Sequence, residues 1–184
     1  MANTKWTAAS LVATVADTDQ VLKVTDPGGT PASERLTVAT LLGRAYGELY
    51  VSAGASGQSL TTSIWNDITQ WASNGASLNT TPDHTNDIIT LDVTGFYLVM
   101  IQMSFSGSNN AEFTMRAKWN GTGQDQVRCQ RKLSSGGDVG SATAMGVVDV
   151  TTASTDLELE VYPDGNHTFT LVDGTMFCCK IGET

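Results

Sequence analysis

Charged residues, cysteine, histidine and proline are all scarce in this sequence, and their scarcity argues against several functions. Charged residues make up 16% of the 184 positions, and 19 acidic against 10 basic residues give a net charge of −9. Because a nucleic-acid partner needs basic patches that neutralise phosphate, we expect no nucleic acid binding. No apolar run approaches the length that a bilayer requires, and residues 1–6 lack the layout of a signal peptide. We therefore expect no membrane partner and a protein assembled in a cytoplasm.

The few cysteines and histidines do not form a pattern of catalytic or metal-binding chemistry. Cys129, Cys178 and Cys179 form no CxxC motif, and we expect reduced, buried thiols with Cys129 and Cys179 on inward strand faces. His84 and His167 both lie in polar segments and have no metal-site spacing. The sequence also lacks the Gly-x-Ser-x-Gly motif of a nucleophile elbow and a glycine loop with a phosphate-binding lysine. It therefore predicts a protein that is not an enzyme and has no cofactor or metal.

Three groups of polar residues allow two interpretations each. Glu158 and Glu160 alternate along a strand, where solvated outward glutamates are favoured over the acid/base pair of a glycan-cleaving enzyme. The segment Asp83–Asp87 gathers oxygen and imidazole donors, which suit either a cation site or a hydrated loop, and the loop is favoured. A basic set suits either docking of an acidic partner or glycan, or strand faces kept soluble, and the second is favoured. That set is Arg116, Lys118, Arg128, Arg131 and Lys132.

Glycine-rich turns and short alternating segments dominate the rest of the chain. From Tyr46 to Ile181 they predict about eight to ten short antiparallel strands, which is typical of a sandwich or jelly roll. Asn120-Gly121 and Asp173-Gly174 are predicted turns. After the second of these turns, the pattern predicts a last strand over Met176–Ile181 with Phe177, Cys179 and Ile181 inward.

The segment Gly95–Ser106 organises this pattern. One face is wholly apolar and predicts a core strand; its residues are Tyr97, Val99, Ile101, Met103 and Phe105. The other face begins with Leu98 and Met100 and turns polar only at Gln102 and Ser104. A strand that is apolar on both faces is buried twice. Either a second copy of the chain covers the outer face, which is favoured, or the protein's own loops do.

Residues 1–45 differ from the remainder because they contain too few large apolar residues to form a core. Val21–Val24 predicts a short strand, and Arg35–Gly43 predicts one or two turns of helix with Thr37 as N-cap. Such a segment must pack on the main domain, on sister chains or on a different protein. Its candidate contact residues are Trp6, Leu11, Val15, Leu22, Val24, Leu36, Leu41 and Leu42.

Residues 46–182 resemble the C1q/TNF-like jelly roll. The features that carry the resemblance are an early aromatic strand, the Gly95-Phe96-Tyr97 motif, Asp156-Leu157-Glu158-Leu159 and the closing strand Met176–Ile181. The resemblance implies an all-β antiparallel jelly-roll sandwich and a tight trimer around a hydrophobic three-fold axis. We therefore divide the chain into an attachment segment, residues 1–45, and a trimerisation domain, residues 46–184. The expected trimer interface residues are Tyr97, Leu98, Met100 and Gln102.

The first part of the chain resembles the short virion-attachment segments of bacteriophage fibre and decoration proteins. The matching residues run from Ala16 to Leu22 and from Arg35 to Leu42. The two resemblances together imply a structural virion protein of a tailed bacteriophage, assembled in the host cytoplasm and bound to a capsid or tail protein. Because the sequence has no shaft of repeats, a capsid decoration or head-fibre role is favoured. The alternative is a tail-fibre or baseplate adhesin that binds a host surface glycan.

Overall fold

A computed structural model of the chain describes residues 20–24, 33–37, 44–52 and 54–183. The chain divides into two units, Met1–Gly43 and Arg44–Thr184. The described part of the smaller unit consists of strands, and that of the larger unit contains strands, turns and loops. Neither described part holds a helix that is long and apolar enough to cross a membrane.

The described part of the smaller unit is one antiparallel pair of strands. β1 (Gln20–Val24) pairs with β2 (Ser33–Thr37), and Leu22 lies opposite Arg35. The predicted strand near Val21 is confirmed. The helix predicted from Arg35 is wrong for its first three residues, which lie in β2, and its remaining residues are outside the described part of the chain. The β-branched Thr37 favours extended backbone once a partner strand is present, so pairing with β1 prevails over the weak helix signal.

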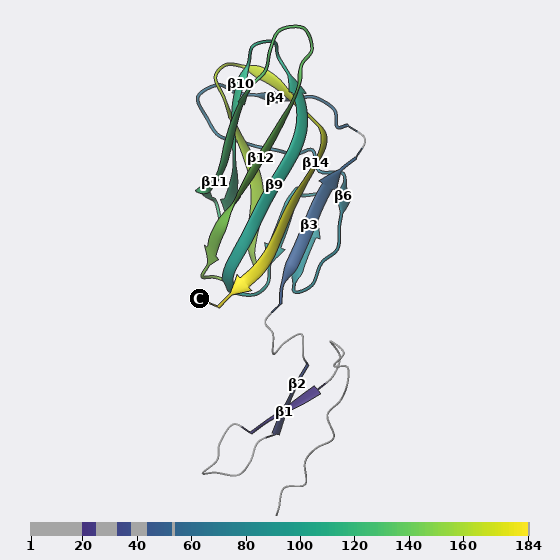
Figure 1. The fold of residues 1–184 in the computed structure, drawn as a ribbon, viewed down its shortest axis with the longest axis vertical. Coiled ribbons are helices and arrows are strands. Elements are labelled where there is room, and N and C mark those ends of the chain that lie inside the picture. Colours follow the sequence, from purple (N-terminus) through teal and green to yellow (C-terminus); the bar gives the residue numbers. More distant parts are fainter. Residues whose placement is uncertain (1–19, 25–32, 38–43, 53, 184) are drawn as a thin grey trace, which may run out of the picture. The chain divides into compact units, whose positions relative to one another are not determined.

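The larger unit is built from two antiparallel sheets, which confirms the predicted all-β class (Figure 1). The first, the β9 sheet, has the order β12-β9-β14-β3-β6, with β4 also pairing with β14. Its strands are β3 (Tyr46–Val51), β4 (Gln58–Leu60), β6 (Ser73–Asn74), β9 (Gly95–Gly107), β12 (Val139–Val150) and β14 (His167–Gly182). The second, the β10 sheet, has the order β11-β10-β13-β8-β7, with β5 also pairing with β13. Its strands are β5 (Asn66–Asp67), β7 (Thr80–Asp83), β8 (Ile88–Leu91), β10 (Glu112–Trp119), β11 (Thr122–Lys132) and β13 (Thr155–Pro163).

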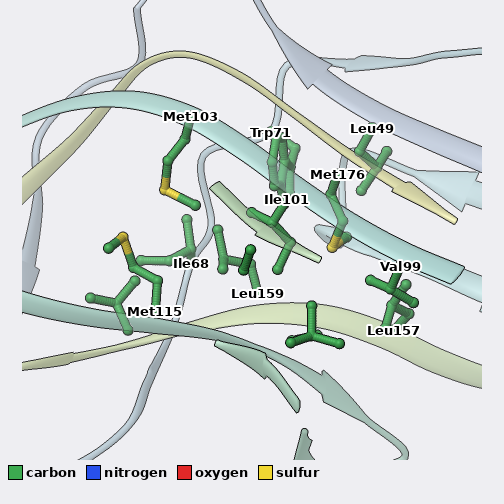
Figure 2. Close-up of a cluster of buried hydrophobic side chains, with 14 of the residues drawn as sticks. Leu49, Ile68, Trp71, Val99, Ile101, Met103, Met115, Leu157, Leu159 and Met176 are labelled. Carbon is green, nitrogen blue, oxygen red and sulfur yellow. The ribbon is translucent and has the colours of Figure 1, made fainter. Parts of the chain in front are cut away.

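The core lies between the two sheets and follows the predicted alternation. All five inward residues of β9, from Tyr97 to Phe105, are at most 2% exposed. Figure 2 shows how side chains of β9 and β14 meet those of β10 and β13, with Ile68 and Trp71 between them. At one end of this core the aromatic rings of Phe105, Phe113 and Phe169 pack together. The ring centroids of Phe105 and Phe169 are 5.0 Å apart. Each large side chain buried in this way stabilises the fold by about 1.5–3 kcal/mol.

The predicted turn at Asn120-Gly121 is confirmed and joins β10 to β11. Asn120 has φ +48° and Gly121 has φ +73°. Two successive positive φ values match a type I′ turn, whose twist suits the right-handed twist of the flanking strands. Asparagine and glycine are the residues that tolerate this conformation at the lowest cost.

β14 is one continuous strand, so the turn predicted at Asp173-Gly174 is wrong. Leu171 pairs with Phe105 and Asp173 with Ser104, which leaves Val172 as the extra residue of a β-bulge. Because side chains alternate with a period of two, one extra residue switches the face of every residue that follows. After the bulge Met176 and Cys178 are fully buried, whereas Ile181 is 56% exposed. The inward orientation predicted for Phe177, Cys179 and Ile181 is therefore wrong.

Gln70 holds the backbone beside this bulge. Its side chain is buried, and its Oε1 accepts a hydrogen bond from Leu171 N at 2.6 Å. Its Nε2 donates to the carbonyl oxygens of Phe169 and Ser56 at 3.0 and 2.9 Å. A buried amide with all these partners fixes where the strand changes face.

The long strands give the larger unit two distinct ends. At one end the backbone N of Lys180 donates to Ala45 O at 2.7 Å, and Gly182 pairs with Phe96 at the start of β9. At the other end, beyond Gly107, Gly136 N donates to Asn109 Oδ1 at 3.3 Å. The larger unit therefore begins at the end where β14 finishes, and the loop between β11 and β12 lies at the opposite end.

Candidate oligomerisation face

The outward face of the β9 sheet carries two rows of large apolar side chains. In one row Met145 of β12 pairs with Met100 of β9, and Met100 pairs with Phe177 of β14. The next row contains Val147, Leu98, Cys179 and Tyr46. Alternation puts the core residues on the opposite side of the same strands. We call this set, together with Phe96 and Ile181, the apolar face.

Several side chains of the apolar face are open to solvent in the single chain. Met145 is 62% exposed, Val147 is 42% exposed and Phe96 is 38% exposed. Leu98 and Met100, in the middle strand, are half-buried by their neighbours. A contiguous apolar patch on a soluble protein is typical of an interaction surface, whereas single exposed apolar residues need no explanation. The register places Met145, Val147, Leu98 and Met100 side by side, so they form a patch. Phe96 lies at its margin, opposite the exposed Asp149.

A polar hollow of about 500 Å³ adjoins the apolar face on the same sheet. Its floor and walls come from β3, β9, β12 and β14, and they include Gln102, Thr143 and Thr175. Glu48 and Asp173 also line it, and Glu48 Oε1 accepts a hydrogen bond from Thr175 Oγ1 at 2.9 Å. The described residues that line the hollow include no lysine or arginine. The two halves of this sheet therefore differ, one apolar and the other polar and acidic.

The four predicted interface residues divide between the two faces of β9. Leu98 and Met100 belong to the apolar face, and Gln102 lines the hollow. Tyr97 lies in the core of its own chain, where it is fully buried and its hydroxyl donates to Val93 O at 2.8 Å. Burial raises the pKa of this tyrosine far above its usual range. Whether the other three contact a second chain stays a prediction.

Sequence reasoning missed most of the apolar face. Met145 and Val147 alternate with buried residues of β12, and this period-two pattern would have placed them outward had it been compared with β9. The sequence pattern does not place Phe177 and Cys179 on the outward face, because the bulge earlier in β14 exchanges the inward and outward positions of the residues after it. The contribution of β14 to this face therefore requires the structure.

The outward face of the β10 sheet is charged and paired. Arg116 Nε lies 2.6 Å from Glu160 Oε1, and Arg116 Nη1 lies 2.7 Å from Asp125 Oδ1. The guanidinium also stacks on Trp65, 3.8 Å from the ring centroid. Glu160 is only 5% exposed, so the solvated orientation predicted for it is wrong. Its register partner on the neighbouring strand, Arg116, supplies a counter-charge, whereas we expected water to solvate this carboxylate.

Three of the other four basic residues of this set also have acidic neighbours, and Lys132 is the exception among the described ion pairs. Lys118 Nζ lies 3.1 Å from Glu158 Oε2, so Glu158 too is paired rather than simply solvated. Arg128 and Arg131 lie 3.6 and 3.7 Å from Asp125 and Asp138. These pairs offset much of the basic charge, which favours soluble strand faces over docking of an acidic partner.

Removal of Arg116 is expected to destabilise the fold, because it leaves the buried Glu160 carboxylate without its partner. We expect Arg116→Met to lower the free energy of unfolding by about 3–5 kcal/mol, the usual range for an uncompensated buried charge. The measurement is urea unfolding at fixed protein concentration. Asp125→Ala is the matched control, since its carboxylate is 67% exposed and such a pair contributes about 0–1 kcal/mol. Equal effects of the two substitutions on the free energy of unfolding would contradict the role of Arg116 as the partner of the buried Glu160 carboxylate.

The three cysteines are free thiols, and their placement corrects one prediction. Cys178, not Cys179, is the inward residue of β14, and burial raises its pKa to about 12. Burial also raises the pKa of Cys129 to about 11 and raises the pKa of the half-buried Cys179. Because the thiolate is the reactive form, we expect slow labelling of all three in the native protein. Titration with a thiol reagent before and after unfolding tests this, and fast native labelling of Cys178 would contradict the strand register.

The candidate cation segment forms a loop closed by its own hydrogen bonds. Asp83 Oδ1 accepts from Thr85 N and Asn86 N at 3.0 and 3.3 Å, and Asp83 Oδ2 accepts from Asn86 Nδ2 at 2.7 Å. Asp87 Oδ1 accepts from Trp71 N at 2.9 Å. These bonds occupy much of the oxygen capacity that a cation would need. Among the described residues no group of histidine, cysteine, aspartate and glutamate has the arrangement of a metal site.

Most of the predicted attachment residues cannot be placed. Leu22 and Val24 lie in β1 and Leu36 lies in β2. The others, Trp6, Leu11, Val15, Leu41 and Leu42, lie outside the described residues. Their role in attachment stays a prediction.

No family profile and no curated protein sequence matches this chain. Solved structures do. The globular domain of zebrafish complement 1qA protein is 10% identical, with a TM-score of 0.50, over 76% of this chain and 99% of its own. Murine APRIL is 16% identical, with a TM-score of 0.50, over 75% and 99%. The PRD1 vertex protein P5 is 17% identical, with a TM-score of 0.49, over 75% and 97%. The larger unit therefore has a C1q/TNF-like jelly-roll fold, as the sequence predicted.

Proposed function

We propose that this protein is a non-enzymatic structural component of a tailed-bacteriophage virion, and that it forms a homotrimer through the apolar face. The observation that carries the proposal is the continuity of that face, where Met145, Met100 and Phe177 lie side by side on three strands. Solvent-exposed apolar rows of this kind are stabilised when another chain covers them. The resemblance to C1q/TNF-like domains supports the trimeric state, and the resemblance of the first segment to phage attachment segments supports the virion role.

Within the virion, a capsid decoration or head-fibre role is the function that we propose. The supporting observation is the simple layout of the chain, in which one jelly roll follows a short segment. A projecting adhesin normally needs a shaft of repeats to hold its tip away from the particle. The smaller unit would dock on a capsid or tail protein, and the larger unit would present its loops outward.

Two measurements test the proposal. Light scattering of the purified protein should give the mass of three chains at micromolar concentration, whereas the mass of one chain would contradict the trimer. Electron microscopy of virions carrying a tagged copy should place the tag on the capsid. A tag on the tail or baseplate would instead support the adhesin that binds a host surface glycan. Absence of the tag from purified virions would overturn the virion assignment.

A further inference from the structure

Lys118, Asp67 and Glu158 meet on the outward face of the β10 sheet in an arrangement that goes beyond ordinary ion pairing. Lys118 Nζ lies 2.5 Å from Asp67 Oδ1 and 3.1 Å from Glu158 Oε2. The three residues come from β10, β5 and β13, and Lys118 is the direct register partner of Glu158. The lysine side chain therefore reaches across β13 to the carboxyl group of Asp67. The amine of Lys118 is thus in contact with two carboxyl groups, one as the acceptor and one as a second acid/base group.

We propose that Lys118 and Asp67 form an intramolecular isopeptide bond, with Glu158 as the proton carrier. The lysine side chain is 13% exposed and the Glu158 side chain is 24% exposed, so both groups are largely withdrawn from water. Burial raises the pKa of Glu158, and hydrogen bonding to Lys118 opposes that effect only in part. Burial lowers the pKa of Lys118, but its hydrogen bonds to Asp67 and Glu158 outweigh this and raise the pKa overall, so loss of the lysine proton is the demanding step. A carboxyl group that takes up a proton more readily than usual suits general acid/base work.

The reaction is a condensation that balances without any further reactant. The ammonium group of Lys118 gives up a proton to Glu158, and the neutral amine attacks Cγ of Asp67. A C–N bond forms, and the nitrogen of the tetrahedral adduct then loses its second proton. Glu158 passes the two protons in turn to one Asp67 oxygen, the Cγ–O bond breaks, and that oxygen leaves as water. One ammonium and one carboxylate are converted into one amide and one water molecule. The net charge of the chain does not change, and Glu158 returns to its starting state.

The fold holds the amine and the carboxyl group close together, whereas separate reactants in water are not held in this way. Groups held in contact within one folded molecule react with effective molarities of about 10⁵–10⁸ M, which favours a condensation that is unfavourable between separate molecules in water. Asp67 is 53% exposed, so the released water has an open path to solvent. The bond would join residues that are 51 positions apart in the sequence. It would also tie the two-residue strand β5 to β10 across β13.

A second lysine provides an internal comparison. Lys180 Nζ lies 2.8 Å from both carboxylate oxygens of Glu183, but that carboxylate is 73% exposed. No other acidic side chain is in ion-pair contact with Lys180 in the described part of the chain. This pair has no proton carrier, so we expect it to stay an ion pair. The protein should therefore lack the mass of one water molecule and not of two.

Intact-mass spectrometry of the purified full chain under denaturing conditions tests the proposal, and it does not depend on the proposed virion role. The parent protein should be lighter than its sequence by one water molecule. A tryptic digest should contain one branched peptide in which Lys118 is uncleaved and joined to the peptide that contains Asp67. Glu158→Gln and Lys118→Arg should each have the full mass of their sequences, with a circular dichroism spectrum like that of the parent.

The parent measurement alone decides the matter if a variant fails to fold. A parent protein at its full sequence mass after prolonged incubation, with no branched peptide, would overturn the proposal and leave an ion pair only. A branched peptide that persists in Glu158→Gln would overturn the assignment of Glu158 as the proton carrier. Lys180→Arg is the matched control and should keep the mass deficit of the parent.

Discussion

Met100→Glu is expected to convert the proposed trimer into monomers or aggregates. Met100 lies at the centre of the apolar face, between Met145 and Phe177. A carboxylate at this position would be unpaired and buried in the proposed interface, which costs on the order of several kcal/mol for each chain. Since a trimer contains three copies, the effect on assembly is multiplied. Light scattering of parent and variant at the same concentration measures it.

The control for this substitution is Ser135→Glu. Ser135 is exposed in the loop between β11 and β12, at the end opposite Ala45. The same charge is added there without entering the apolar face, so the trimer should persist. A Met100→Glu protein that stays trimeric would show that the chains associate through another surface. Near-identical circular dichroism of the variant and the parent would confirm that the domain itself remains folded.

Deletion of residues 1–43 is expected to leave a folded trimer that no longer joins virions. The larger unit keeps its whole core in this truncation, and it also keeps the bond from Lys180 N to Ala45 O. In the full protein, three attachment segments would act together, because docking of the first raises the effective concentration of the others. Because the truncation removes each contact as well as the multivalent gain of about 10²–10⁴, we expect attachment to fall by at least that factor.

The test mixes purified full-length and truncated protein with particles that lack the native protein, and quantifies the bound fraction after sedimentation. A companion variant, Leu36→Asp, alters one predicted attachment residue and leaves the larger unit unchanged. It should bind more weakly than the full-length protein. Undiminished attachment of the truncated protein would show that the β-domain makes the contact. The division of roles between the two units would then be wrong.

Period-two alternation was enough to predict most of the sandwich. It placed Tyr97 to Phe105 on the core side of β9, and it placed Phe113, Met115 and Ala117 on the core side of β10, where all three are fully buried. The turn at Asn120-Gly121 could also be predicted from local sequence, since few residue pairs favour two successive positive φ values. These signals are local, and β9 and β10 follow the period-two rule along the residues named here, although the pairing of β10 with β11 shifts register between Arg116 and Ala117.

Features that depend on a partner strand could not be predicted from local sequence patterns. The bulge at Val172 is defined by its pairing with β9, so the inward position of Cys178 and the outward position of Phe177 were predicted the wrong way round. Asp173-Gly174 resembles a turn, yet its residues stay paired with Ser104 and Met103. The burial of Glu160 likewise depends on Arg116, which lies 44 positions earlier in the sequence.

The separation of the two ends of the larger unit makes the protein a candidate scaffold for peptide display. The loop between β11 and β12 contains Gly136 and Gly137, with φ of +95° and +85°, and a side chain added at either would meet no atom within 4 Å. This loop lies at the end of the larger unit opposite Ala45, and Ala45 is near the point where the proposed attachment segment precedes the larger unit in the sequence. An epitope spliced between these two glycines would lie at this same end of the larger unit, opposite Ala45, and it would not crowd the apolar face proposed for assembly.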